Sequence, residues 1–279
     1  MHHNPPPPRG IVGLAREIFN LNKPKIKFRK NSRYDKPVCV KAMRQNADKI
    51  EQVFSLLEDE RSKEIYRLEL LSRKKSKNMM PSVYVEPVCD QYFDREIIRF
   101  EEKEIFIDAG AYDGATTALF LQYASNSFAK AYLLEPDAAM YQAMLEKMAP
   151  LNDGNLEFIK AGLYDKSGTA KFESRPIGSS NINTEGTEEI NTVALDDLVD
   201  EATFIKMDIE GAELKALMGA RNIIQKNKPK LAISIYHNID DLWMVPLLIH
   251  SINPAYKLYV RKYEGAAGYF LNEVVCYAI

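Results

Sequence analysis

The sequence predicts an α/β fold with a doubly wound, mostly parallel sheet, and two observations support this prediction. From Glu104 onward, apolar runs of strand length alternate with helix-like segments, which is typical of parallel strands joined by crossover helices. The last two strand-like segments, 256–261 and 273–279, are separated by too few residues for a crossover helix. They must therefore run antiparallel, so that the sheet ends in a C-terminal antiparallel hairpin.

Each expected strand of the main sheet is a short run of apolar residues. These runs lie near residues 105–109, 131–135, 156–160, 203–208 and 231–236. The helices between and after them are expected near 115–124, 137–149, 212–226 and 241–252. A longer insertion follows the third strand, where two strand-like segments, 169–173 and 191–195, surround a polar loop.

Composition limits the class of protein. The chain has 279 residues, of which 46% are hydrophobic and 27% charged, enough for one good core plus an appendage. A net charge of −2 argues against a nucleic-acid partner. Three widely spaced cysteines without metal-binding spacing indicate reduced thiols. No apolar run approaches the roughly 20 residues of a membrane span, and no secretory signal is evident, so we expect a cytoplasmic protein without a transmembrane segment.

Three regions are expected along the chain. Residues 1–35, rich in proline and basic residues, form a disordered or extended tail. Residues 36–90 form a helical appendage, because apolar residues recur there at spacings of three and four, with a break near Asp59 and a linker from Pro81 to Pro87. Residues 91–279 form the α/β domain. The appendage fits three roles equally well: covering an active site, forming a homodimer, or shielding the sheet.

The turn after the first strand of the main sheet contains two glycines. The apolar run Ile105 to Ile107 stops at Asp108, and a helix follows Gly114. A strand, a glycine turn and a helix together present backbone N–H groups to a ligand. Gly110 permits a tight turn or a positive φ, and Gly114 is expected to let the backbone approach the ligand closely.

The second strand ends in an acid, Glu135, which is placed to bind both hydroxyls of a ribose. The turn reads G-x-x-x-G, so the pyrophosphate fingerprint G-x-G-x-x-G is incomplete. A ligand with adenosine and an amino-acid tail would instead use Asp108 and Asp113 toward its ammonium group. Each of these residues alone reads as an ordinary turn acid, but together they predict S-adenosylmethionine as the cofactor.

A second acidic group follows the strand 203–208. Asp208 and Glu210 lie where that strand ends, and Glu213 begins the next helix, where a carboxylate is favoured. A helix-start role explains Glu213 but not the other two, because adjacent buried acids repel and need a cation, a proton or a donor. No histidine lies nearby in the sequence, so no metal site is predicted.

His237 follows the next strand, 231–236, and is predicted to lie beside Asp208 because a crossover helix joins the two strands. An imidazole with a pKa near neutrality suits a general base, and Asp208 would orient it or contact the methyl donor. A structural, hydrogen-bonded histidine is the alternative. The loop 178–183, with Ser179 and Ser180, is a candidate substrate loop or a plain surface turn.

Residues 91–279 resemble the FkbM-type methyltransferase family. The resemblance rests on Gln91-Tyr-Phe-Asp94, Phe106-Ile-Asp-Ala-Gly-Ala-Tyr-Asp-Gly114, Glu135-Pro136, Phe204-Ile-Lys-Met-Asp-Ile-Glu-Gly-Ala-Glu213, Leu231-Ala-Ile-Ser-Ile-Tyr-His237 and Asp241-Leu-Trp-Met-Val-Pro246. It implies a class I, Rossmann-like methyltransferase that uses S-adenosylmethionine to methylate a hydroxyl of a sugar, glycan or natural product.

The resemblance also suggests a role for each candidate site residue. The amino-acid end of the cofactor would be held by Asp108, Gly110, Ala111, Tyr112, Asp113 and Gly114. Glu135 and Pro136 would bind the ribose, and Ala161, Gly162 and Leu163 would flank the adenine. His237 and Asp208 would be catalytic, with Asp208 also near the cofactor. The acceptor would contact Ser179, Ser180, Glu210 and Glu213.

Two other functions compete with this one. A nicotinamide-dependent oxidoreductase on a dinucleotide-binding fold is disfavoured by the G-x-x-x-G turn and by the terminal antiparallel pair. A non-catalytic binding protein with the same fold is disfavoured by the presence of Asp208 and His237.

Overall fold

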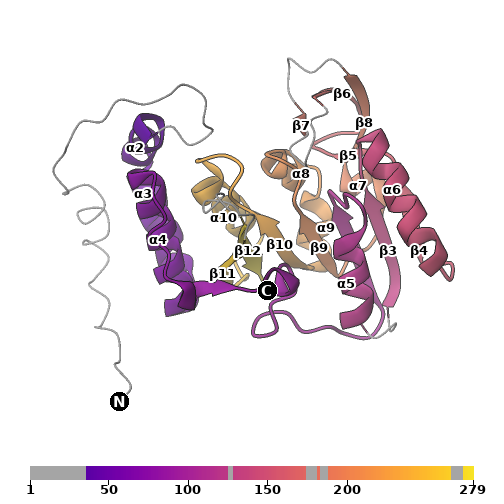
Figure 1. Ribbon diagram of the computed structural model, residues 1–279, viewed down its shortest axis with the longest axis horizontal. Coiled ribbons are helices and arrows are strands. Elements are labelled where there is room, and N and C mark those ends of the chain that lie inside the picture. The colour runs from indigo at the N-terminus through magenta and orange to yellow at the C-terminus, as the bar shows by residue number, and fades with distance from the viewer. Residues whose placement is uncertain (1–35, 125–127, 174–180, 183–187, 265–272) are drawn as a thin grey trace.

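The computed structural model describes residues 36–124, 128–173, 181–182, 188–264 and 273–279. Its largest element is an eight-stranded sheet with the strand order β1-β11-β12-β10-β9-β2-β3-β4 (Figure 1). The strands of this sheet are β1 (Val85–Glu86), β2 (Glu104–Ala109), β3 (Phe128–Leu134), β4 (Leu156–Ile159), β9 (Phe204–Met207), β10 (Lys230–Ser234), β11 (Leu258–Tyr263) and β12 (Val274–Ala278).

The strand directions confirm the predicted fold class. β12 lies between β10 and β11 and is antiparallel to both. The other neighbouring strands of this sheet pair in parallel. The chain therefore forms a doubly wound, mostly parallel sheet that ends in an antiparallel hairpin.

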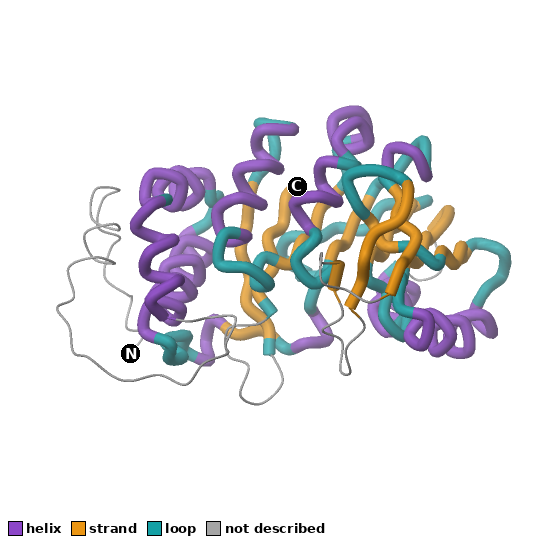
Figure 2. The backbone as a smooth tube through the Cα atoms, turned by 90° about the horizontal axis from the view of Figure 1, so that it is seen from above, coloured by secondary structure: helices purple, strands orange, loops and turns teal. Residues whose placement is uncertain are grey.

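Helices cover both faces of the sheet, as the view from above shows (Figure 2). On one face Phe106 of β2 packs with Phe120 of α5 (Ala115–Tyr123) and Met144 of α6 (Ala138–Met148). On the other face Ile107 belongs to a core with Trp243 of α10 (Asp241–Ile252). Successive residues of β2 thus contribute to opposite cores, as the two-residue period of a strand requires.

The predicted helix 212–226 is two helices, α8 (Glu213–Met218) and α9 (Arg221–Asn227). The break falls at Gly219, where an added Cβ would lie 2.1 Å from the carbonyl oxygen of Tyr164. Asp196, in the short helix α7 (Leu195–Leu198), accepts hydrogen bonds from the amides of Asn222 and Ile223 at the start of α9. Both contacts come from the insertion, so the sequence of this helix alone could not reveal the break.

The insertion forms a second, four-stranded sheet with the order β5-β8-β6-β7. Its strands are β5 (Gly162–Leu163), β6 (Gly168–Glu173), β7 (Asn181–Ile182) and β8 (Glu188–Val193). The two predicted strands correspond to β6 and β8, which pair antiparallel. The predicted substrate residues Ser179 and Ser180 lie outside the described residues.

The segment before residue 91 packs against the edge of the main sheet. It contains α2 (Lys36–Gln45), α3 (Ala47–Leu56) and α4 (Glu60–Lys75), which stand beside β11 in Figure 1. The helix break predicted near Asp59 is confirmed, because the side chain of Asp59 caps α4 by accepting a hydrogen bond from the amide of Ser62. None of the helices in the described part of the chain is long and apolar enough to cross a membrane.

The stretch expected to be a linker instead adds a strand to the sheet. Val85 and Glu86 form β1, which pairs in parallel with Lys262 and Tyr263 of β11. Leu57, just before α4, forms an isolated parallel bridge with Leu258. The side chain of Arg261 joins Asp59 to Asp94, at 2.8 and 3.3 Å, and is only 2% exposed. The helices therefore share hydrogen bonds, ion pairs and an apolar core with the sheet.

Candidate active site

The turn after β2 is shaped by its contact with the end of β9. Gly110 has φ +73°, and an added Cβ would lie 1.9 Å from the carbonyl oxygen of Asp208. Glycine is thus required there both for its conformation and for the close approach of another strand. Gly114 also has a positive φ, but its added Cβ would meet Met148 of α6 at 2.4 Å. The close approach at the Cβ position of Gly114 is therefore one of helix packing, and the predicted approach of its backbone to a ligand stays a prediction.

Asp108 is fully buried and has two side-chain partners. It accepts a hydrogen bond from the hydroxyl of Thr117 at 2.7 Å and forms an ion pair with Lys206 at 2.9 Å. Asp108 and Lys206 are direct neighbours across β2 and β9. Lys206 also donates to the carbonyls of Ala109 and Gly110 at 3.1 and 2.7 Å. The pair therefore holds the glycine turn, and the predicted contact of Asp108 with a ligand's ammonium group stays a prediction.

Glu135 lies directly after β3 and is connected to the same turn. One carboxylate oxygen accepts a hydrogen bond from the amide of Tyr112 at 3.0 Å, and the other accepts one from the amide of Asp137 at 2.9 Å. Burial raises the pKa of Glu135 to about 7, although these backbone donors oppose the shift. The carboxylate is thus oriented before any ligand binds.

The remaining predicted cofactor residues follow the carboxyl ends of β2, β3 and β4. Tyr112 is 43% exposed and has a positive φ of 53°. Asp113 forms an ion pair with Lys147 of α6 at 3.0 Å. Ala161, Gly162 and Leu163 are buried and follow β4, whose last residue, Ile159, accepts a hydrogen bond from the amide of Glu135. Pro136, the residue after Glu135, is partly buried.

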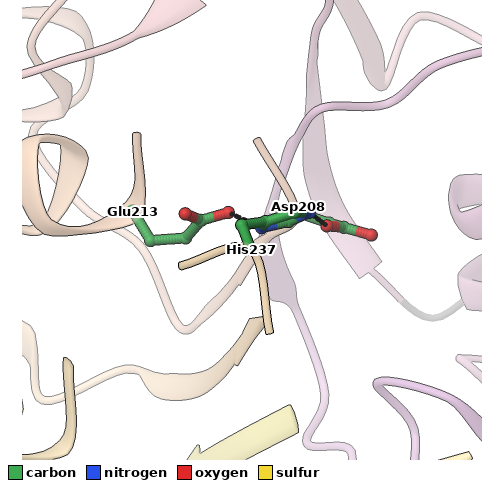
Figure 3. A group of neighbouring side chains, drawn as sticks. All are labelled: Asp208, Glu213 and His237. Atoms are coloured by element: carbon green, nitrogen blue, oxygen red, sulfur yellow. Dashed lines mark ion pairs between the residues drawn. The ribbon is translucent and has the colours of Figure 1, made fainter. Parts of the chain in front are cut away.

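His237 lies between carboxylates, as Figure 3 shows for Glu213 and Asp208. Its Nδ1 is 2.8 Å from Glu213 Oε1, and its Nε2 is 3.2 Å from Asp208 Oδ1 and 3.7 Å from Glu210 Oε2. The parallel pairing of β9 with β10 brings these residues together, as the sequence predicted. The sequence predicts Asp208 as the partner of His237, but the carboxylate that faces Nδ1 belongs to Glu213. Glu213 Oε1 also accepts a hydrogen bond from the amide of Ile209.

The charge state of His237 differs from the expected one. Burial alone would lower the pKa of its imidazole, but Glu213, Asp208 and Glu210 outweigh burial and raise it to about 9. Burial also opposes ionisation of Asp208, yet His237 and Lys206 hold its pKa below the usual value. At neutral pH the unliganded site therefore contains an imidazolium between carboxylates.

Four further residues contribute to the site that sequence reasoning did not assign to it. The hydroxyl of Tyr92 donates to Asp208 Oδ2 at 2.6 Å, and that of Tyr236 lies 3.2 Å from Asp208 Oδ1. The carboxylate of Glu273 accepts a hydrogen bond from Gln91 at 2.6 Å. Lys206, already described, is the fourth. Tyr92 lies in the stretch Gln91-Tyr-Phe-Asp94, which was recognisable as a motif although its position beside Asp208 was not.

Comparison with known proteins identifies the family. Residues 108–269 match the family model described as the methyltransferase FkbM domain, which covers more than half of the chain. The chain belongs to the FkbM methyltransferase family. This membership agrees with the resemblance drawn from the sequence and with the class I, Rossmann-like fold.

Two methyltransferases illustrate the similarity. The hexuronic acid methyltransferase AglP of Haloferax volcanii is 31% identical over 147 residues, which are 47% of this chain and 58% of that protein. The crystal structure of the methyltransferase FkbM from Methylobacillus flagellatus KT superposes with a TM-score of 0.72 at 28% identity, covering 86% of this chain and 60% of that one. The chain thus spans about three fifths of each relative's length.

Proposed function

We propose that this FkbM family member is an S-adenosylmethionine-dependent O-methyltransferase that acts on a hydroxyl of a sugar or glycan, with an acidic sugar as the best candidate. The observation that carries the proposal is the position of Glu135. Its carboxylate lies at the carboxyl end of β3, oriented by the amide of Tyr112 from the glycine turn. This arrangement suits the two hydroxyls of a ribose.

The cofactor is proposed to lie along the carboxyl ends of β2, β3 and β4. Glu135, with Pro136 beside it, would accept hydrogen bonds from the ribose hydroxyls, and residues 161–163 would flank the adenine. Residues 108–114 would surround the amino-acid end. Within this turn Asp108 acts through Lys206, which fixes the carbonyls of Ala109 and Gly110.

The acceptor is proposed to lie at the carboxyl ends of β9 and β10, where Asp208, Glu210, Glu213 and His237 gather. In the reaction the acceptor oxygen attacks the sulfonium methyl carbon, and the carbon–sulfur bond breaks with its electron pair remaining on sulfur. The products are the methyl ether and S-adenosylhomocysteine, and the hydroxyl proton is lost to solvent at the end of the site that contains Asp208 and His237. Alignment of the two reactants is the main contribution of the protein. An acidic acceptor is suggested by the hexuronic acid named for the Haloferax relative.

Calorimetric titration tests the cofactor. We expect S-adenosylhomocysteine to bind the purified protein at one site and NAD⁺ not to bind. The reverse result would favour the oxidoreductase and overturn the proposal.

A methyl-transfer assay tests the acceptor. Glucuronic acid, galacturonic acid and the matching neutral hexoses, offered as free sugars and as glycosides, would be incubated with isotopically labelled S-adenosylmethionine. We expect label in the uronic acid products. Cofactor binding without transfer to any sugar would instead support a different acceptor class or the non-catalytic alternative.

A further inference from the structure

The donor atoms around His237 have the spacing of ligands to one metal ion. Asp208, Glu213 and His237 form a group whose possible ligand atoms lie within 4.8 Å of one another, with Glu213 facing Nδ1 and Asp208 facing Nε2. The Nε2 atom lies 3.2 Å from Asp208 Oδ1 and 3.7 Å from Glu210 Oε2. Neighbouring ligands lie about 3.0 Å apart around an octahedral ion with bonds of about 2.1 Å, and about 3.3 Å apart around a tetrahedral one. An ion bound to Nε2 would therefore find its nearest carboxylate oxygens on Asp208 and Glu210.

The other nitrogen of His237 has the partner that metal-binding histidines usually have. Nδ1 lies 2.8 Å from Glu213 Oε1 inside the protein, where His237 is 1% exposed and Glu213 is fully buried. A carboxylate on one ring nitrogen fixes the tautomer and directs the other nitrogen toward a metal. Here that other nitrogen, Nε2, faces Asp208 and Glu210 (Figure 3 shows Asp208).

The local charges allow a divalent cation to replace a proton. Three carboxylates, those of Asp208, Glu210 and Glu213, surround the imidazole of His237, and Nε2 would release its proton when an ion binds. Burying several like charges together is costly unless a cation or protons compensate them.

We propose that His237 Nε2, Asp208 Oδ1 and Glu210 Oε2 bind a divalent cation, with Glu213 holding Nδ1 as the outer partner. One imidazole with carboxylate oxygens suits Mn²⁺ or a similar six-coordinate ion, whereas Ca²⁺ takes oxygen ligands only. Asp208 and Glu210 retain side-chain exposures of 23% and 21%, so water and acceptor oxygens can reach the ion.

The cation would specify how the acceptor binds, and this inference rests on the proposed function. It would coordinate the reacting hydroxyl together with a second oxygen of the acceptor, such as a neighbouring hydroxyl or a carboxylate. An ion held this way joins an anionic sugar to an acidic site and lowers the pKa of the hydroxyl, whose proton is lost to solvent. The electron pair of the oxygen then attacks the methyl carbon as above, so His237 acts as a ligand and not as the direct proton acceptor.

Electron paramagnetic resonance tests the site directly, because the signal of free aqueous Mn²⁺ diminishes when the ion binds. The purified 279-residue protein would be treated with a chelator, dialysed and titrated with Mn²⁺, with and without S-adenosylhomocysteine. We expect one bound ion per chain. His237→Gln and Asp208→Asn should abolish binding, and Glu213→Gln should weaken it about 10- to 100-fold, as for the loss of an outer-sphere partner.

Two variants serve as matched controls. His250→Ala removes a histidine of α10, and Glu157→Gln removes a partly exposed acid of β4 that forms an ion pair with Lys130. Both should bind Mn²⁺ like the wild type. Calorimetry with S-adenosylhomocysteine and circular dichroism would verify that each variant is folded.

The outcomes separate this proposal from the proposed function. If Mn²⁺ stays free at millimolar concentration while S-adenosylhomocysteine binds, the cation site is refuted and the methyltransferase proposal stands. Mn²⁺ binding that survives in His237→Gln also refutes the site. If Mn²⁺ binds as expected but S-adenosylhomocysteine does not, the cation site stands and the proposed cofactor is wrong.

Discussion

The carboxylate of Glu135, at the end of β3, accepts a hydrogen bond at 3.0 Å from the amide of Tyr112, in the turn that follows β2. This contact joins the residue proposed to bind the ribose to the turn proposed to bind the amino-acid tail. The loss of this carboxylate should therefore affect both the ligand and the turn.

Cofactor binding should depend on pH through Glu135. Burial raises the pKa of its carboxyl to about 7, and ribose hydroxyls donate best to the ionised form. The affinity for S-adenosylhomocysteine should therefore increase as pH rises from 6 to 8, by up to about 10-fold per pH unit below the pKa. Calorimetry across this range would measure the effect. Glu135→Gln should bind S-adenosylhomocysteine weakly at every pH, whereas Glu157→Gln should behave as the wild type. If the affinity of Glu135→Gln followed the same pH profile as that of the wild type, Glu135 would not be the group responsible.

The carboxyl group of Glu135 should lower the stability of the folded protein as pH rises, although it raises the affinity for the cofactor over the same range. Its folded pKa, about 7, lies above the ordinary value of 4.5, so the folded state holds a proton that the unfolded state releases between these pH values. The resulting stabilisation, at most about 3 kcal/mol, is fully present below pH 4.5 and is lost as pH rises through 7. Urea unfolding at pH 5 and pH 8 should show a smaller loss of stability for Glu135→Gln than for the wild type. An equal loss in both proteins would contradict the assignment.

Gly110→Ala should destabilise the protein strongly, by roughly 3 kcal/mol or more, because its Cβ would overlap the carbonyl oxygen of Asp208. Gly154 is the matched control, since its φ is also positive, at +100°, but nothing lies within 4 Å of an added Cβ. Gly154→Ala should cost only the conformational strain of about 1–2 kcal/mol. Equal unfolding free energies for the two variants would show that the close approach at Gly110 is unimportant.

Arg261→Ala should destabilise the protein by about 3–5 kcal/mol, because it removes a 2% exposed guanidinium and leaves Asp94 buried without that ion pair. The exposed ion pair of Lys257 with Glu58 offers a comparison on the same strand–helix edge. Lys257→Ala should leave the unfolding free energy almost unchanged, because the pair is exposed to solvent. Urea unfolding of both variants would measure the difference, and similar small losses would mean that the Arg261 cluster contributes little.

The sequence predicted those features that depend on order along the chain. The neighbouring positions of Asp208 and His237 followed from two consecutive parallel strands joined by a crossover helix. The antiparallel β12 followed from the short connection after β11. In the same way, Glu135 could be assigned to a sheet edge because an apolar strand precedes it.

Features that depend on contacts between distant segments were not predictable in this way. Nothing in the stretch around Lys206 indicates that its ammonium group is buried beneath the glycine turn. Tyr92 reaches Asp208 across 116 positions of sequence, from a segment with no regular period. Likewise, the sequence does not reveal that α6 packs against Gly114, and the two residues of β1 are too short a run to be recognised as a strand.

The pairing of the α4 region with β11 also bears on how the chain is made. The hydroxyl of Ser62 accepts a hydrogen bond from the amide of Val260, 198 positions later. At about 5–20 residues per second, a ribosome needs roughly 10–40 seconds to synthesise that interval. Throughout this time the apolar side of the early helices lacks its partner strand, so this surface is prone to aggregation until β11 emerges.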